Sequence, residues 1–171
     1  EGGPDLEAAR RDLMAYLHGR RQRLDWPLDL RLARSDFQRS VLQATAAIPY
    51  GAVVSYMGLA HDIGKASATR AVAQALRWNP LPIAIPCHRV IGASGALTGY
   101  AGTKLGLKQR LLTIEGVPTT KEGDGPTIRA QAMYVLYPGD REYCIPTCPS
   151  LDTRRPAPLT RFGSRRHAEA V

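Results

Sequence analysis

The chain has 171 residues, 44% of them hydrophobic, which suffices for one ordinary domain with an appendage or for two small ones. Its net charge of +8 favours nucleic acid as a partner, then an anionic membrane surface, over a merely solvated basic surface. No apolar run approaches the roughly 20 residues that span a bilayer. Three cysteines and an acidic, polar start predict neither a disulfide framework nor a signal peptide, so we expect a cytoplasmic protein.

The spacing of apolar residues predicts a mainly helical chain. Helices are expected within the segments 5–21, 35–48, 55–64, 67–79 and 103–116. Ser35, Ser55 and Ser67 stand where N-caps belong, and Gly64 is a natural helix stop. Strand-like apolar residues in 89–102 predict a hairpin or wing.

Two of the expected helices, 55–63 and 68–78, have the lengths of a helix-turn-helix around the turn GKAS. The second is rich in alanine, including Ala68 and Ala71, which permits close approach to a packing partner. A tight helix contact inside a core is the alternative. Arg70, a long cation among small side chains, instead suits insertion into a DNA groove or stack.

The segment 79–91, NPLPIAIPCHRVI, ends in a thiol, an imidazole and a guanidinium after a run stiffened by prolines. A thiol reacts as the thiolate, so a group must remove its proton. Neighbours in an extended segment point apart, and we therefore expect His88 to act on Cys87 through water. Glu115 is the candidate carboxylate that orients His88. An inert buried thiol is the alternative.

The motif NPLPIAIPCHRVIG, with ALTGYAG after it and IPYGAVVSY before it, resembles the O6-alkylguanine-DNA alkyltransferases over residues 24–117. The resemblance implies a mainly α, winged-helix-like catalytic domain with a small β wing. It divides the chain into 1–30, a remnant of an α/β N-terminal domain, and 31–118, the DNA-binding catalytic domain. The polar, glycine-rich segment 119–133 reads as a linker, and 134–171 as an irregular tail.

The resemblance also implies roles for the reacting groups. Cys87 would be the nucleophile and alkyl acceptor, His88 the base acting through water, and Glu115 its support. Asn79 would brace the active-site loop. Tyr56 would hydrogen-bond the flipped guanine and help to rotate its phosphate.

The same resemblance implies a DNA-binding surface on the second helix of the helix-turn-helix. Arg70 would fill the space left by the extruded base, with Ala68, Ala71 and Arg77 beside it in the minor groove. Double-stranded DNA carrying O6-alkylguanine would be the partner of a monomer, and base flipping would precede a single irreversible transfer that needs no cofactor.

The resemblance implies a guanine pocket in addition. Tyr100 would wall it, Lys108 would lie near the guanine, and the backbone of Val90 would read the exocyclic amine. Ala101 stands where relatives often carry serine, so a hydroxyl near O6 would be lost.

The tail resembles the first half of the zinc-bearing methyl-phosphotriester repair domain of adaptive-response proteins. Cys144 and Cys148 match its first cysteine pair, and the second pair would come just beyond Val171. Two thiolates do not close a tetrahedral site, so we expect an incomplete, poorly folded module without stable zinc. A chance Cys-x-x-x-Cys is the alternative.

Rival functions belong to other classes. A non-catalytic alkyltransferase-like damage binder would replace the cysteine, and Cys87 argues against it. A transcriptional regulator, or a fragment of an adaptive-response regulator, would need base-reading side chains where the helix carries alanine. A cysteine hydrolase would need an oxyanion hole and would turn over.

Overall fold

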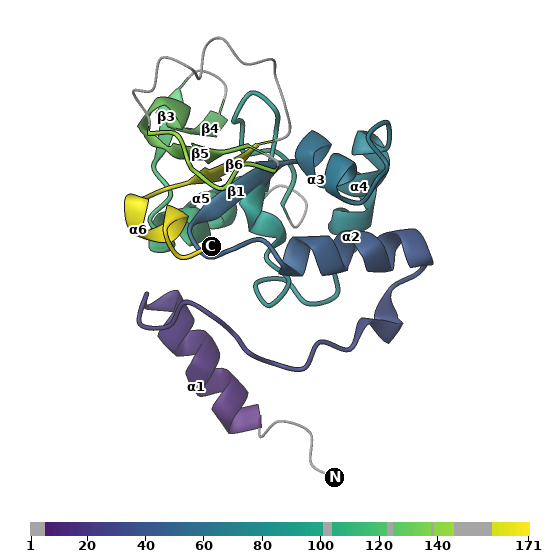
Figure 1. Ribbon diagram of the computed structural model, residues 1–171. Coiled ribbons are helices and arrows are strands. Elements are labelled where there is room, and N and C mark those ends of the chain that lie inside the picture. The colour runs from purple at the N-terminus through teal and green to yellow at the C-terminus, as the bar shows by residue number, and fades with distance from the viewer. Residues whose placement is uncertain (1–5, 101–103, 123–124, 138, 146–158) are drawn as a thin grey trace.

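The computed structural model describes residues 6–100, 104–122, 125–137, 139–145 and 159–171. Figure 1 shows helices along the first two thirds of the chain and mostly short strands in the last third. The prediction of a mainly helical domain with a small β part is confirmed. The helices are α1 (Leu6–Leu17), α2 (Asp36–Ala46), α3 (Tyr56–Asp62), α4 (Thr69–Arg77), α5 (Leu105–Ile114) and α6 (Arg165–Ala168). The strands are β1 (Ala52–Ser55), β2 (Val90–Ile91), β3 (Thr119–Glu122), β4 (Gly125–Ile128), β5 (Tyr134–Leu136) and β6 (Thr160–Phe162).

Side-chain caps start two of the central helices. The hydroxyl of Ser35 accepts the backbone N–H of Gln38 at 3.1 Å, and that of Ser55 accepts the N–H of Gly58 at 2.9 Å. Both predicted caps are confirmed. The predicted cap at Ser67 is wrong, because the N–H of Ala68 closes a turn onto the carbonyl of Lys65 at 2.8 Å and the helix starts one residue later.

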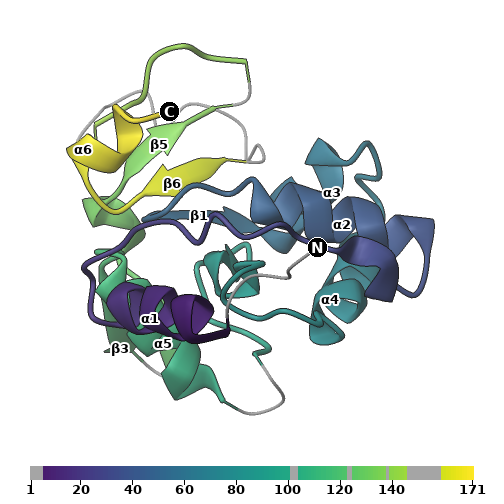
Figure 2. The same ribbon diagram turned by 90° about the horizontal axis from the view of Figure 1, so that it is seen from below.

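Helices α2, α3 and α4 form one group on the side of the molecule away from β5 and β6 (Figure 2). Gly64 ends α3 in the left-handed conformation with φ of +69°, which a glycine adopts without strain. The short turn that follows lets α4 fold back across α2 and α3. The helix-turn-helix expected from the sequence is therefore present.

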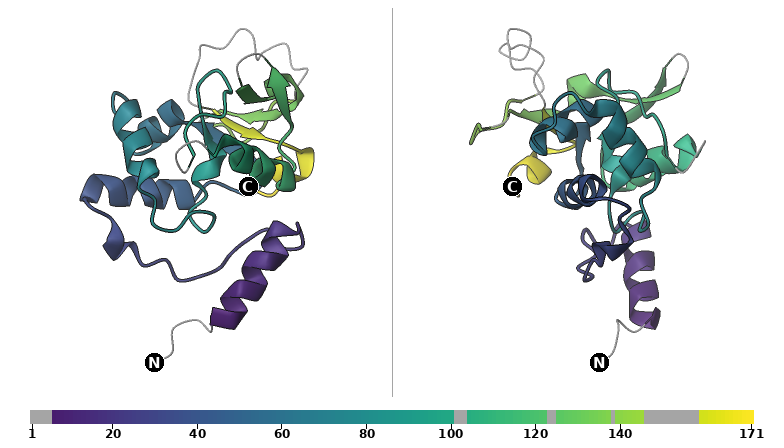
Figure 3. Two further views of the ribbon diagram at one scale, coloured as in Figure 1. Left: turned by 180° about the vertical axis from the view of Figure 1, so that it is seen from behind. Right: turned by 90° about the vertical axis from the view of Figure 1, so that its right-hand side faces the viewer.

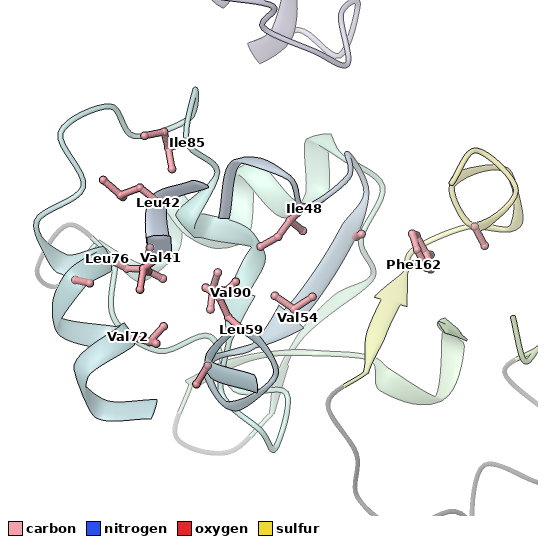
Figure 4. Close-up of a cluster of buried hydrophobic side chains, with 14 residues drawn as sticks. Val41, Leu42, Ile48, Val54, Leu59, Val72, Leu76, Ile85, Val90 and Phe162 are labelled. Carbon is pink, nitrogen blue, oxygen red and sulfur yellow. The ribbon is translucent and has the colours of Figure 1, made fainter. Parts of the chain in front are cut away.

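The main core lies between this helix group and the sheet, and its aliphatic side chains interlock as Figure 4 shows. Val41 of α2, Leu59 of α3 and Val72 of α4 are each at most 1% exposed. Val90 joins them from β2, directly after the Cys87–His88–Arg89 turn. Each such side chain contributes about 1.5–3 kcal/mol by burial, which fixes the turn against the helices.

The larger sheet has the strand order β2-β1-β6-β5. β1 and β2 run parallel with Val54 opposite Val90, whereas β6 pairs antiparallel with β1 through Ala52 and Phe162. The wing expected within 89–102 is only partly correct. A tight turn does follow β2, where the N–H of Gly92 bonds the carbonyl of Ala96 at 2.8 Å, but Ala96 then bridges to β4 rather than back to β2.

The segment 119–133 is not a structureless linker. β3 and β4 form an antiparallel hairpin, followed by a 3-10 turn at Ala130–Ala132. The composition of this segment did not indicate the hairpin, because its threonines are polar. Threonine nevertheless favours strands. Ile128 is 5% exposed because it packs in a second core with residues of β1, β2 and α5.

The tail is likewise not an irregular appendage where the structure describes it. β6 and β5 extend the sheet of the catalytic domain, and Phe162 is 1% exposed in the main core. A Cβ on Gly163 would collide with the carbonyl oxygen of Gly116, so the two backbones are in direct contact. The segments 134–145 and 159–171 therefore belong to the same packed body as residues 31–118, and the boundary expected at 134 is wrong.

Helix α1 and the connection after it run along the outside of this body (Figure 3). Leu6 at its start is 84% exposed, whereas Tyr16 in its last turn is 1% exposed and packs against the body. Within the described ranges, no helix is long and apolar enough to cross a membrane.

Candidate active site

The loop that carries Cys87 is braced by Asn79. Its Nδ2 donates to the carbonyl of Ile85 at 2.9 Å, and its Oδ1 accepts the N–H of Leu81 at 3.0 Å. Ile83 has a φ of +78° and is, in the part of the chain that the structure describes, the one non-glycine residue in that region. Such a conformation persists only where surrounding contacts impose it. The loop thus holds Cys87 at the start of a 3-10 turn, Cys87–Arg89.

His88 and Glu115 form the buried pair that the sequence suggested. The Nε2 atom of His88 lies 2.6 Å from Oε1 of Glu115, and both side chains are fully buried. Glu115 occupies this position because it caps the C-terminus of α5, with its N–H bonded to the carbonyl of Leu111 at 3.1 Å. The sequence-based prediction therefore paired two residues that are 27 positions apart along the chain and in contact in the structure.

Arg89 is the counter-charge of Glu115, a role that sequence reasoning missed. Its Nε and Nη2 donate to the two carboxylate oxygens at 2.9 and 3.0 Å, and its Nη1 donates to the carbonyl of Ile48. A guanidinium paired through two nitrogens is the strong form of such a bond. The position of Arg89 directly after Cys87 and His88 in the motif was the signal from which this role could have been inferred.

Two further groups complete the shell around Glu115. The hydroxyl of Tyr16, from α1, donates to Oε1, and the backbone N–H of Gly51 donates to Oε2 at 3.2 Å. The spacing of apolar residues in the segment 5–21 places Tyr16 on the apolar face of a helix and gives no sign of this polar role. Its hydroxyl also lies 3.4 Å from Nε2 of His88, so α1 contributes directly to the buried network.

Burial and charge set the protonation of these groups. Burial alone would raise the pKa of Glu115, but His88 and Arg89 outweigh it and hold the pKa at about 2. Burial lowers the pKa of His88. Because the carboxylate is ionised, Nε2 carries the proton of the neutral ring, and Nδ1 keeps its lone pair. Nδ1 is buried and has no hydrogen-bond partner among the described residues, so it is the basic nitrogen of the site.

Burial raises the pKa of the Cys87 thiol, more than Asn79 and Lys108 lower it. The resting sulfur is consequently a thiol, and a base must take its proton before it attacks. A cavity of about 550 Å³ opens in front of it. Its lining combines α3, α4 and the segment 98–100: Tyr56, Thr69, Arg70, Ala73, Leu76, Arg77, Cys87, Thr98, Gly99 and Tyr100.

The aromatic residues expected in the pocket lie there in different ways. Tyr100 is 5% exposed, and its ring stands edge-on to His88 at 6.4 Å between centroids. The hydroxyl of Tyr56 donates to the carbonyl of Thr98 at 3.1 Å, so it would have to release this bond to reach a guanine. Ala101 lies outside the described residues.

Lys108 lies behind the cavity wall rather than in it. Its Nζ is buried and donates to the carbonyls of Val90 and Thr98 at 2.5 and 2.8 Å. Burial lowers the pKa of Lys108 to about 8. The carbonyl of Val90 is thus already engaged, although a second lone pair remains for the predicted contact with an exocyclic amine.

The candidate DNA-binding residues share the start and the outer face of α4. Arg70, Ala71 and Arg77 are exposed, and Ala68 is the half-buried N-cap. Arg70 and Arg77 also line the cavity with Cys87. Helix α4 therefore presents cations on both sides of a small, smooth alanine surface.

The candidate zinc ligands are not assembled where the structure describes them. Cys144 forms a β-bridge with Val135, and Cys148 lies outside the described residues. In the described ranges no group of three or more possible metal ligands occurs.

A family model for the DNA-binding domain of 6-O-methylguanine DNA methyltransferase matches residues 36–117. The constitutive methylated-DNA–protein-cysteine methyltransferase of Bacillus subtilis is 46% identical over 114 residues, 67% of this chain and 68% of that protein. The chain belongs to the methylated-DNA–protein-cysteine methyltransferase family. A second member, from Mycolicibacterium paratuberculosis, is 52% identical over 103 residues, 60% of this chain and 61% of that one. The chain thus spans about two thirds of the length of these family members.

Solved structures agree with the family assignment. OGT of Mycobacterium tuberculosis in complex with DNA is 47% identical with a TM-score of 0.60, covering 64% of this chain and 66% of that one. Atl1 of S. pombe, in complex with damaged DNA containing O6-carboxymethylguanine, is 30% identical with a TM-score of 0.51. That match covers 56% of this chain and 90% of Atl1.

Proposed function

We propose that this protein repairs DNA by moving the alkyl group of an O6-alkylguanine from duplex DNA onto Cys87. The observation that carries the proposal is the position of Cys87 in a cavity of about 550 Å³, beside a neutral histidine oriented by a buried carboxylate. The name of the family member from Bacillus subtilis supports the same reaction. The DNA in the OGT and Atl1 structures supports DNA as the partner.

The chemistry follows from the protonation of the site. The proton of the Cys87 thiol passes through one water molecule to Nδ1 of His88, whose other nitrogen is held by Glu115. The thiolate attacks the alkyl carbon in line, so that a C–S bond forms while the bond between carbon and O6 breaks. The electron pair goes to guanine, which takes up a proton and leaves as the neutral base.

The alkyl carbon lies inside a duplex, so the base must first be flipped out of the stack. Arg70 stands at the start of α4 and lines the cavity. In the proposed reaction it fills the space that the base leaves. Unstacking costs a few kcal/mol, and this replacement offsets part of it. Alanines on the outer face of α4 permit close approach to the minor groove.

A thioether is stable, so each chain reacts once. The protein acts as a monomer in this proposal, and the transfer needs no cofactor. The reaction requires access to DNA, and a cytoplasmic location is part of the proposal. Zinc on Cys144 and Cys148 has no role in it.

A damage binder without transfer is the second candidate, because Atl1, whose structure holds damaged DNA, is matched over 90% of its length. The thiol at position 87 favours transfer over binding alone.

Product counting separates these possibilities. With O6-methylguanine duplex in excess, repaired guanine should equal the protein in amount and then stop. A cysteine hydrolase would continue to form product, and a binder would form none. Cys87→Ala should form no product yet retain the duplex, because the substitution removes the reacting sulfur and leaves the exposed cations of α4 in place.

A further inference from the structure

The exposed face of α4 continues past the cavity to an aromatic residue. Arg70, Ala71, Gln74, Arg77 and Trp78 are exposed along this face. Trp78 is 53% exposed, although an indole is among the side chains that gain most from burial. A large apolar ring on the outer surface of a basic helix is a feature that requires an explanation.

Trp78 does not lie free on the surface. The guanidinium of Arg34 lies over its ring at 4.1 Å from the centroid, and that of Arg77 lies at 6.0 Å. About half of the Trp78 surface remains exposed to solvent beside these two cations. The result is a patch of one aromatic ring and two cations, which we name the Trp78 patch.

The Trp78 patch is built on a rigid base. The side-chain amide of Gln38 donates to the carbonyls of Ala75 and Trp78 at 3.0 and 3.2 Å, and its oxygen accepts the N–H of Arg34 at 2.6 Å. Gln38 is 4% exposed. One buried amide therefore fixes the start of α2 to the end of α4, and the patch is preformed.

The cations of the patch are available to a ligand. Arg10, Arg31 and Arg39 are paired with neighbouring carboxylates. Arg34 and Arg77 have no ion pair within the described part of the chain. Their charge is thus uncompensated beside an exposed ring, which is the combination that binds a nucleic-acid strand, where cations meet phosphates and the aromatic ring meets a sugar or base.

Spacing along α4 places the patch relative to the lesion. Trp78 follows Arg70 by eight residues, which is about 12 Å along a helix. With a rise of about 3.4 Å per nucleotide, this corresponds to three or four nucleotides. Figure 1 shows α2 and α4 side by side on the same side of the molecule, so both contribute to one surface.

We propose that the Trp78 patch binds the sugar–phosphate backbone of DNA three or four nucleotides from the flipped base, with the indole against a deoxyribose and Arg34 on a phosphate. The proposal rests on the proposed function, because it uses α4 as the groove-facing helix. It adds a contact outside the lesion pocket that holds the duplex during base flipping.

The chain offers a direct readout, since Trp26 and Trp78 are its two tryptophans. Trp26→Phe leaves Trp78 as the single fluorophore, and Cys87→Ala in the same chain prevents reaction. On saturation with O6-methylguanine duplex, followed by anisotropy of labelled DNA, acrylamide quenching of Trp78 should fall at least twofold. Unchanged quenching at saturation would overturn the patch proposal alone. An absence of binding would overturn the proposed function with it.

Substitutions give an independent test. Arg34→Ala should lower the slope of log affinity against log salt by about 0.9, the value of one phosphate contact. Arg31→Ala is the matched control, because Arg31 lies three residues before Arg34 but is paired with Asp29. The salt slope of this variant should equal that of the wild type. Trp78→Ala should weaken duplex binding, because it removes the apolar surface that contacts the deoxyribose. Equal slopes for both arginine variants would contradict the proposal.

Discussion

The Nε2 atom of His88 lies 2.6 Å from Oε1 of Glu115, and both side chains are fully buried. An ionised carboxylate on Nε2 leaves Nδ1 as the base. Arg89 then neutralises the carboxylate, which allows a buried anion to persist. In the proposed reaction the pair serves the thiol chemistry, and its contacts also stabilise the fold.

Replacement of Glu115 should therefore affect both the reactivity of the site and the stability of the fold. Glu115→Gln leaves Arg89 buried without a counter-charge, and we expect a loss of about 3–5 kcal/mol in the free energy of unfolding. The carboxylate, with its folded pKa of about 2, contributes stability that is present above its ordinary pKa and is lost as pH falls towards about 2. Urea unfolding of both proteins should show the wild type losing more stability than the variant between about pH 5 and pH 2. Parallel losses would contradict this role.

The rate of transfer should resist mild acid. Burial lowers the pKa of His88, so the ring stays neutral at pH values where an ordinary histidine, with a pKa of about 6.5, is half protonated. The reaction with free O6-benzylguanine should keep most of its rate at about pH 6.5 and decline only below it. A half-maximal rate at or above that pH would show that His88 is not held neutral.

Arg70 should matter for extrusion and not for attack. We expect Arg70→Ala to slow repair of duplex DNA much more than the reaction with free O6-benzylguanine, because the free base needs no flipping. Single-turnover rates on the two substrates give the comparison. Equal losses would mean that Arg70 is structural.

The tail should be needed for stability. Phe162 is 1% exposed in the main core, and Phe162→Ala should cost about 3–5 kcal/mol in urea unfolding. Removal of all residues after Thr120 should destabilise the domain further, since β6 then leaves the edge of β1 unpaired. An irregular tail outside the catalytic domain, as the sequence suggested, would instead be dispensable for stability. Arg166→Ala is the control, because Arg166 is exposed and its loss should have little effect. A truncated chain as stable as the full one would contradict the observed packing.

Local signals predicted the parts of the fold that depend on near neighbours. Caps at Ser35 and Ser55, the turn at Gly64 and the order of α3 and α4 could be read directly from residue types. The pairing of His88 with Glu115 came from chemistry and from a family resemblance rather than from periodicity.

Contacts between distant segments could not be read in this way. Tyr16 contacts Glu115 across 99 residues of sequence. The spacing of apolar residues places Tyr16 on the apolar face of its helix and does not indicate a partner for its hydroxyl. β6 joins β1 across more than 100 residues, from a segment whose composition resembled a separate module. Both depend on which surfaces meet in three dimensions, and no local pattern records that.

The central claim is transfer of an alkyl group to one named sulfur, and mass spectrometry tests it directly. After incubation with duplex DNA containing O6-methylguanine, the intact chain should gain the mass of one methyl group, and peptide mapping should locate it on Cys87. A gain mapped to Cys144 or another residue, or no gain while guanine is restored, would contradict the assignment of Cys87 as the acceptor.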